Sequence, residues 1–290
     1  MIILEYLLLI FATLASSAKA LFCKRIGTEN GSDRRFYELN SLIFLGAAIT
    51  AVILSPLIGG VHFSLTTLLL SVVFATSLTL TQILQMYAMR HGPASVTTLI
   101  YSFGFLVPIV YGFFALNEAI SVYQIVGIFV AALSLVFITD PRVDRRIGKL
   151  WLALSLLAAL GSGINAVLQK LHRALTPESE IGGFLVLAFL FSSLLSFAAS
   201  RKFPRAATDS PIVTRIPFTL FSGFAIGVLN NMNLLIAGRL PAVIQFPIYN
   251  IGSMILVGLA GKFMFGDKLT AKQTTGFCVG CIAILIIGLL

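Results

Sequence analysis

Lys19 is the charged residue whose position most strongly suggests chemistry, because it lies inside the first long apolar run, between Ala18 and Ala20. Polar groups in hydrocarbon are costly, usually face the interior of a helix bundle and mark the routes that solutes take. An ammonium group here predicts contact with a carboxylate or phosphate, or a group that titrates during a coupling step. Alternatively, the long side chain lifts its charge to the membrane interface near Lys24 and Arg25. The sequence leaves both interpretations open.

Amide side chains form a second set of polar groups within apolar runs. Gln82 and Gln85 are three residues apart, so they share one helix face, and Asn230 and Asn233 repeat that spacing. Amides donate and accept hydrogen bonds without net charge, which suits a zwitterionic or hydroxylated solute. Alternatively, they hold helices together, at about 0.6–2 kcal/mol per contact. The amides taken as candidate solute-binding residues are Gln82, Gln85, Asn165, Asn230, Asn233 and Asn250.

Tyr101 and Tyr249 each lie three residues before a glycine, in equivalent places of two similar segments. A hydroxyl or ring that contacts a solute is one interpretation, and an internal packing aromatic is the other. Both tyrosines join the candidate solute-binding residues.

Motifs for catalysis or metal binding are missing from the sequence. It contains no GxxxxGK[ST], HExxH or nucleophile-elbow pattern. His62, His91 and His172 lie at or near predicted loops, and no acid lies near the middle of an apolar run. Cys278 and Cys281 form a CxxC without a second Cys/His pair, which favours simple packing. We therefore expect no enzyme activity, no cofactor and no bound metal.

The composition indicates a membrane protein. Of 290 residues, 58% are hydrophobic and only 11% are charged, whereas soluble domains carry about 25% charged residues. The net charge of +9 does not indicate nucleic-acid binding, because the basic residues form short clusters between apolar runs, as in cytoplasmic loops. Since a span needs about 20 mostly apolar residues, we predict an all-α integral membrane protein. The ten predicted spans are 2–23, 36–57, 64–89, 93–116, 121–139, 149–171, 179–200, 213–238, 241–264 and 270–290.

The chain also contains an internal repeat. Shifted by 148 residues, 93–104 (PASVTTLIYSFG) matches 241–252 (PAVIQFPIYNIG) at Pro, Ala, Ile, Tyr and Gly positions. Similar shifts align candidate polar residues: Gln82 with Asn230, Gln85 with Asn233, and Lys19 with Asn165. Five spans per half is an odd number, so the second half must enter the membrane from the opposite side. We predict two inverted five-helix repeats, 1–140 and 149–290, within one structural unit.

Turn and glycine positions continue the repeat. Gly127 aligns with Gly276, and we expect the final helices of the halves to contact each other, or the periphery, through these small residues. Glu118 and Asp267 are expected to be turn residues that favour the N-terminus of the following helix.

These features resemble the EamA-like members of the drug/metabolite transporter superfamily. The shared features are two five-helix halves, a Pro-Ala turn into each fourth helix, an acidic NEAIS or GDKLT turn, and a glycine-bearing final helix. The resemblance implies a substrate path lined by the first four helices of each half, with the fifth and tenth helices peripheral. It also implies transport of metabolites such as amino acids or their relatives. The chain departs from the family pattern in lacking a basic N-terminus and a charged C-terminal tail.

The sequence thus predicts a secondary transporter of a small polar organic metabolite, which works by alternating access, with the solute and the bilayer as its partners. Two alternatives are a flippase or exporter of an amphiphile or drug, and a non-transporting receptor or scaffold. Sixteen of the twenty Lys and Arg residues lie in or beside the odd-numbered connections, which places both termini outside the cytoplasm, in a cell (plasma) membrane. The family resemblance implies the opposite, with both termini inside. The substrate, the direction of transport, the coupling ion and the oligomeric state do not follow from the sequence.

Overall fold

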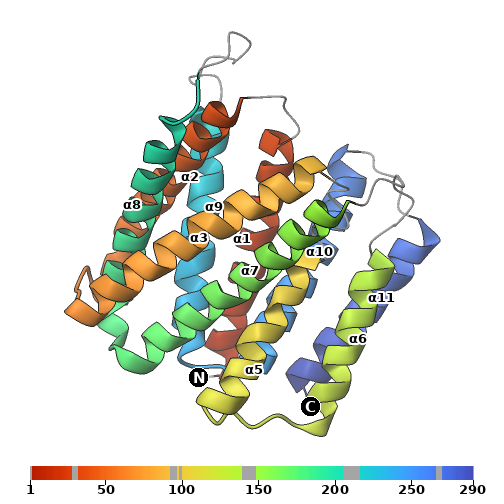
Figure 1. Ribbon diagram of the computed structural model, residues 1–290. Coiled ribbons are helices and arrows are strands. Elements are labelled where there is room, and N and C mark those ends of the chain that lie inside the picture. The colour runs from red at the N-terminus through yellow and green to blue at the C-terminus, as the bar shows by residue number, and fades with distance from the viewer. Residues whose placement is uncertain are drawn as a thin grey trace. The chain divides into compact units, whose positions relative to one another are not determined.

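A computed structural model describes residues 2–27, 32–91, 97, 100–138, 148–204, 216–265 and 270–289. The α-helices in these ranges are α1 (Ile2–Gly27), α2 (Asp33–Leu54), α3 (Leu65–His91), α5 (Leu106–Ala115), α6 (Val122–Ile138), α7 (Lys149–Leu175), α8 (Ile181–Ser200), α9 (Ile216–Ala237), α10 (Ala242–Phe265) and α11 (Ala271–Leu289) (Figure 1). Three single turns of 3-10 helix accompany them, η1 (Ser55–Ile58), η2 (Phe103–Phe105) and η3 (Glu178–Glu180). No strand occurs in the described ranges, and the predicted all-α fold is confirmed.

Each predicted span contains a described helix, and five helices are long and apolar enough to cross a membrane by themselves. Four shorter apolar helices lie within the fourth, fifth, ninth and tenth predicted spans. Two predicted ends are wrong by about a full turn: α1 continues to Gly27 instead of ending at residue 23, and α7 continues to Leu175 instead of ending at residue 171. The polar residues that suggested a loop at the end of α7 are buried inside the helix, as described below.

The distribution of side chains is that of a protein dissolved in lipid. Large apolar residues are exposed along the helices, for example Phe114 (76%) and Phe129 (72%). Small polar residues lie inside, and Ser71, Ser134 and Ser192 are fully buried. Their hydroxyls donate to backbone carbonyls, as Ser71 Oγ does to the oxygen of Thr67 at 2.6 Å. Because lipid favours apolar surfaces and drives polar groups inward, the chain is an integral membrane protein.

The described contacts divide the chain into two compact units. The first unit consists of Met1–Leu14, Leu80–Val167 and Arg239–Leu290, and the second of Ala15–Thr79 and Leu168–Gly238. Helices α1, α3 and α7 each contribute one part to either unit. Each unit therefore contains segments from both halves of the sequence.

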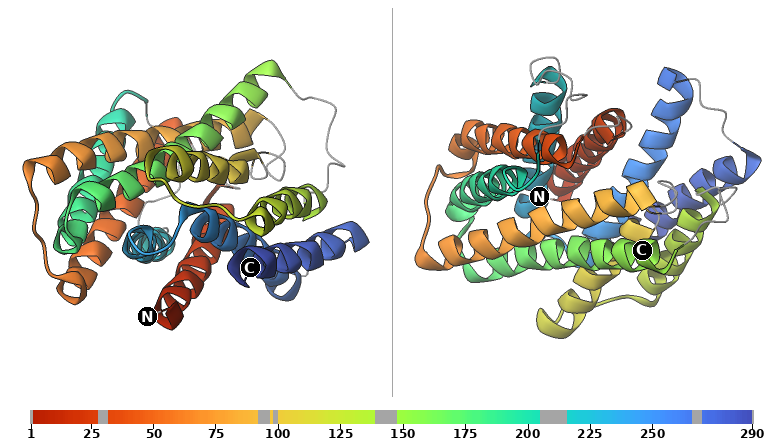
Figure 2. Two further views of the ribbon diagram at one scale, coloured as in Figure 1. Left: turned by 90° about the horizontal axis from the view of Figure 1, so that it is seen from below. Right: turned by 45° about the horizontal axis from the view of Figure 1, so that its top comes forward.

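Within the second unit, the matched helices α2 and α8 pack side by side (Figures 1 and 2). Tyr37, near the start of α2, stacks on Phe203 just after α8, with ring centroids 5.3 Å apart. Further along α2, Asn40 donates to the hydroxyl of Ser196 at 3.1 Å. Residue numbers rise along one helix as they fall along the other, so the two helices are antiparallel.

The first unit contains a second antiparallel pair, α6 and α11, seen side by side in Figures 1 and 2. Ser134 in α6 donates to the carbonyl oxygen of Gly276 at 2.9 Å. Earlier in α6, the Cα of Gly127 faces Ile287, near the end of α11. The predicted contact between the final helices through Gly127 and Gly276 is confirmed.

The stretch that ends in α5 and its counterpart α10, also in the first unit, form a third such pair. Ser102 Oγ lies 3.4 Å from the sulfur of Met254, and Glu118 accepts a hydrogen bond from the backbone N–H of Ala242 at 2.6 Å. Three pairs of matched helices thus run in opposite directions within their units. Antiparallel counterparts are required by an inverted repeat, and parallel repetition is excluded for these pairs.

The turn before α6 gives Glu118 a contact that the sequence did not predict. Its carboxylate accepts from the backbone N–H of Ala242 and so binds the N-terminus of α10. The following helix, α6, is capped by Ser121 and Gln124. The Ser121 hydroxyl accepts from the backbone N–H of Gln124 at 3.1 Å, and Gln124 Oε1 accepts from the backbone N–H of Ser121 at 3.0 Å. The counterpart Asp267 lies outside the described residues.

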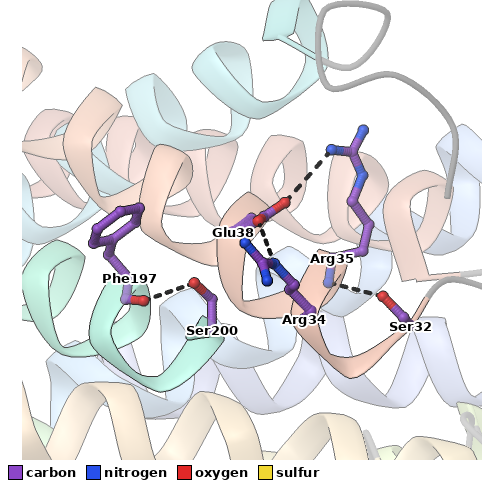
Figure 3. Close-up of polar contacts among 6 residues, drawn as sticks. All are labelled: Ser32, Arg34, Arg35, Glu38, Phe197 and Ser200. Atoms are coloured by element: carbon purple, nitrogen blue, oxygen red, sulfur yellow. Dashed lines mark hydrogen bonds and ion pairs between the residues drawn. The ribbon is translucent and has the colours of Figure 1, made fainter. Parts of the chain in front are cut away.

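At the start of α2, two arginines lie where the helix dipole is unfavourable to positive charge. Ser32 accepts from the backbone N–H of Arg35 at 3.2 Å and caps the helix. Glu38 compensates the charge, with its carboxylate 3.0 Å from Arg34 Nε and 3.9 Å from Arg35 Nη1 (Figure 3). Because α2 begins at Asp33, these arginines belong to the helix and not to the predicted loop.

Candidate functional site

The predicted solute-binding residues fall into both units. Lys19, Asn230 and Asn233 belong to the second unit. The first unit contains Gln82, Gln85, Tyr101, Asn165, Tyr249 and Asn250. Each set is therefore described within its own unit.

Lys19 lies in α1 and is half-buried. No hydrogen bond or ion pair joins its ammonium group to the part of the chain that the structure describes. A half-buried cation of this kind can bind an anionic group or reach the interface by extension of its side chain.

The asparagines of α9 are all buried, with exposed fractions of 8% for Asn230, 1% for Asn231 and 5% for Asn233. Asn230 accepts from Gln169 Nε2 of α7 at 2.7 Å and donates to the carbonyl oxygen of Ile226 at 2.9 Å. Asn230 thus forms an interhelical hydrogen bond and is also a candidate ligand of the solute. Asn231, which was not among the predicted site residues, is the most buried of the three. The spacing of Asn230 and Asn233 on one helix face therefore does not separate them from Asn231, because α9 is enclosed on most sides.

In the first unit, α3 and α7 bring part of the amide set together. Asn165 Nδ2 lies 3.4 Å from Thr81 Oγ1, and Thr81 precedes Gln82 in α3. The two helices are close here because Gly161 has no side chain: a Cβ at this position would lie 3.2 Å from the Cβ of Thr81. Gln82 and Gln85 are half-buried, and no hydrogen bond to either was found among the described residues.

Tyr101 and Tyr249 both lie in the first unit. The Tyr249 ring packs edge-on against Phe246, with centroids 6.0 Å apart, and contacts the apolar core of the unit. Asn250 donates to the carbonyl oxygen of Phe246 in its own helix at 2.9 Å. Of the two interpretations of these tyrosines, the structure shows the packing role for Tyr249.

Two buried acceptors stand out among these side chains. Asn165 Oδ1 and Asn231 Oδ1 are enclosed, and neither has a hydrogen-bond partner within the described ranges. Such acceptors are rare in proteins unless water, a ligand or a strained arrangement accounts for them. They suit a solute that offers N–H or O–H donors.

Two cavities of the first unit have a different character. The first, of about 250 Å³, is lined by Tyr6, Leu9, Ile10, Thr13, Ile248, Ile284 and Leu285. The second, of about 440 Å³, is lined by Ile100, Phe103, Gly104, Val107, Leu156, Ala159 and Leu160. Their walls are almost wholly apolar and include none of the predicted site residues, so they suit acyl chains better than a polar solute.

A polar stripe along α7 was missed by the sequence analysis, apart from Asn165. It consists of Asn165, Gln169 and His172 in α7 and of Thr176, which directly follows the last helical residue, with exposed fractions of 8%, 4%, 0% and 8% in that order. Their spacing of four, three and four residues places them on one helix face. This spacing is visible in the sequence, but the predicted helix end at residue 171 assigned its last part to a loop. Lys170, which the charge count placed in or beside a connection, is also only 2% exposed.

No group of three or more His, Cys, Asp or Glu side chains suitable for a metal ion occurs among the described residues.

Comparisons with known proteins agree with this architecture. Residues 3–140 match the EamA-like transporter family. No curated protein matches the chain. A solved structure described only as "Crystal structure of protein" has a TM-score of 0.78 at 13% sequence identity, covering 98% of this chain and 96% of that chain. At this identity the similarity concerns the fold.

Proposed function

Because residues 3–140 make this chain a member of the EamA-like transporter family, we propose that the protein is a secondary transporter that moves a small polar organic metabolite by alternating access. Family membership supports membrane transport of the drug/metabolite type. The mechanism is a further step, supported chiefly by the antiparallel pairing of matched helices, such as Asn40 of α2 with Ser196 of α8. Inverted repeats allow a transporter to expose one site to either side of the membrane in turn.

The proposed solute carries hydrogen-bond donors and an anionic group, as amino acids do. In the first unit, the unpartnered acceptor Asn165 Oδ1 would accept from an ammonium or hydroxyl group of a solute, and Gln82 and Gln85 would add amide contacts. In the second unit, Asn231 Oδ1 offers the same kind of acceptor, and Lys19 would bind a carboxylate or phosphate.

A flux screen in liposomes tests this proposal, with the purified chain and pooled amino acids, sugars and phosphorylated metabolites. We expect uptake or exchange of at least one polar solute. An absence of flux for every pool would contradict the transport mechanism and favour a receptor or scaffold.

Variants then locate the site. Gln82→Ala should weaken transport about tenfold, the loss expected when about 1.4 kcal/mol of binding energy is removed. Thr76→Ala in the same helix is the control, since Thr76 is exposed and bonds only its own helix through the carbonyl oxygen of Val72. Equal effects of the two changes would show that Gln82 has no special role.

Lys19→Met and Lys19→Gln remove the charge and retain most of the side-chain length. If the ammonium binds an anionic group, affinity falls steeply while expression is maintained. The control is Lys202→Met, because Lys202 is exposed in the connection after α8. Normal transport by the Lys19 variants would support the interfacial position of this side chain.

Export of an amphiphile is the second candidate function, favoured by the two apolar cavities of the first unit. Release of a fluorescent phospholipid or hydrophobic dye, without flux of any polar solute, would support it.

The proposed location is the plasma membrane, with both termini outside the cytoplasm, as the distribution of Lys and Arg favours. A C-terminal reporter that fluoresces only in the cytoplasm tests this orientation, and a bright signal would reverse it.

A further inference from the structure

His172, near the end of α7, is a fully buried titratable side chain with no part in the proposed solute contacts. Its ring lies against the ring of Phe184 of α8, with centroids 4.2 Å apart and planes 31° apart. A buried imidazole needs hydrogen-bond partners, because an unpaired polar group in a low-dielectric interior is costly. Two hydroxyl groups supply them.

Thr67 Oγ1 lies 3.1 Å from His172 Nε2, and Thr176 Oγ1 lies 3.2 Å from Nδ1 and 3.1 Å from Nε2. The proton of each hydroxyl is already engaged elsewhere. Thr176 donates to the carbonyl oxygen of His172 at 2.7 Å, and Thr67 donates to the carboxylate of Glu180. A hydroxyl has one proton and two lone pairs, so both oxygens present lone pairs to the ring. Surroundings of this kind can accept two ring N–H groups as readily as one.

Glu180 extends this network towards the surface. Its Oε2 accepts from the backbone N–H and the hydroxyl of Ser64 at 3.2 and 2.8 Å, and from Thr67. Glu180 is half-exposed, whereas His172 is fully buried. A continuous hydrogen-bonded chain therefore runs from a partly exposed carboxylate through one hydroxyl to a buried imidazole.

We propose that His172, Thr67 and Glu180 form a proton-binding site that makes transport dependent on pH. This inference rests on the proposed transport function and identifies the proton as the coupling or controlling ion. A proton from water binds the carboxylate of Glu180. The protonated Glu180 donates to Thr67 Oγ1, and the Thr67 hydroxyl turns to donate to Nε2 of the Nδ1–H tautomer. The Glu180 O–H bond then breaks as its proton passes to Thr67 Oγ1, and the original Thr67 proton passes to Nε2. The ring ends with two N–H groups, the carboxylate regains its negative charge, and Thr67 donates to Glu180 as the geometry shows.

The charged neighbours act in opposite directions on a second ring proton: Arg173 opposes it, and Glu180 favours it. On α7, Arg173 is the nearest cation, and its Nη2 lies 3.2 Å from the carboxylate of Glu178. Lys170 lies half a turn before His172 on the same helix. Glu180 supplies the negative charge from η3, while α3 and α8 contribute the uncharged Thr67 and Phe184 to the described contacts.

The site also joins segments that must separate if this end of the second unit opens. Through Ser64 and Thr67, Glu180 links the start of α3 to the start of α8. Beside this link, the start of α8 also lies close to η1, since a Cβ at Gly182 would lie 2.8 Å from the Cβ of Ser55. A change in proton occupancy would alter the bonds that hold these segments together, and so would couple protonation to movement.

Nitrogen NMR of the histidine rings in the full-length protein, in lipid nanodiscs without solute, tests proton binding directly. We expect one ring, assigned by its loss in His172→Gln, to change from one N–H to two as the pH falls. In Glu180→Gln, this ring should gain its second proton about one pH unit lower, because the compensating negative charge is lost. Thr67→Val should also move the midpoint. His62→Gln is the control, since His62 is exposed at the same end of the unit.

Because a change at a fully buried ring can prevent folding, the Glu180 and Thr67 variants, which keep His172, carry the test. A ring that keeps one protonation state across the ordinary histidine range, or a midpoint that neither variant moves, would overturn the proton site. Transport is measured separately in the liposomes with the solute found by the flux screen. Flux that ignores pH in the wild type would refute the coupling while leaving the transport function intact. Proton binding without flux of any solute would instead count against the transport function.

Discussion

The α2/α8 pair of the second unit and the α6/α11 pair of the first unit join matched helices by different means. Between α2 and α8, side chains bond each other across the interface, as Asn40 does with Ser196 and Ser41 with Ser193, both at 3.1 Å. Between α6 and α11, small residues let the backbones approach, and one hydroxyl bonds a carbonyl. Lipid supplies no hydrophobic drive for helices to associate, so packing and hydrogen bonds must hold them.

The difference indicates distinct roles for the two pairs. Directional side-chain bonds specify one register and can be exchanged for others, which suits a unit that also contains buried His172 and Lys170. Close packing of small residues has few alternatives and suits a fixed contact. We therefore expect the α6/α11 pair to be the more rigid of the two, and four sets of substitutions test the packing within the two units.

Gly183→Ala should have the largest effect. The added Cβ would overlap the carbonyl oxygen of His62 and lie 2.8 Å from its carbonyl carbon. Because backbone cannot rotate away as a side chain can, we expect a loss of about 3 kcal/mol in stability, measured by thermal unfolding in detergent. Gly148→Ala is the control, since no atom of the described residues, its chain neighbours aside, lies within 4 Å of its Cβ position. An unchanged melting temperature for Gly183→Ala would mean that the start of α8 is less closely packed than described.

Gly127→Ala should have a smaller effect, about 1 kcal/mol, because its Cβ would meet a side chain, 2.5 Å from Ile287 Cγ1. Combining it with Ile287→Ala, which removes that atom, should make the double variant more stable than the sum of the single effects predicts. A double-mutant cycle measures this coupling. Additive effects would refute direct contact at this point of the α6/α11 interface.

Asn40→Ala and Ser196→Ala test the polar pair of the second unit in the same way. A coupling energy of about 0.6 kcal/mol is expected for one hydrogen bond between membrane helices. We also expect these variants to alter transport kinetics more than Gly127→Ala does, because the α2/α8 bonds are proposed to be exchangeable. A larger kinetic effect of Gly127→Ala than of Asn40→Ala and Ser196→Ala would contradict the expectation that the α6/α11 pair is the more rigid.

Ser134→Ala should have the smallest effect, about 0.5 kcal/mol, since packing of small residues remains when its bond to the Gly276 carbonyl is lost. Thr275→Ala in α11 is the control, because Thr275 is exposed and bonds only its own helix through the carbonyl oxygen of Ala271. A loss for Ser134→Ala as large as that for Gly127→Ala would show that the hydrogen bond, and not the packing, holds this pair.

The sequence predicted part of the candidate site and missed part of it for identifiable reasons. Tyr249 was proposed for its place in the repeat, with packing as the alternative, and the structure packs its ring against Phe246. Asn230 was proposed for its spacing from Asn233, yet its described partner is Gln169 of another helix. No local pattern could identify that partner, because it depends on which faces of α7 and α9 meet.

Local physical chemistry by itself determined the lipid environment and the helical spans, and it predicted the inverted order of the halves. Length, continuous apolarity and the odd number of spans are properties of a chain segment and its solvent, and they need no knowledge of distant contacts. The tertiary structure decided the roles of individual polar residues. Glu118 binds a backbone N–H that lies 124 positions further along the chain, and Asn40 bonds a serine 156 positions away. Within lipid, a polar side chain takes whichever partner the packed helices place beside it, so its role depends on how the helices meet.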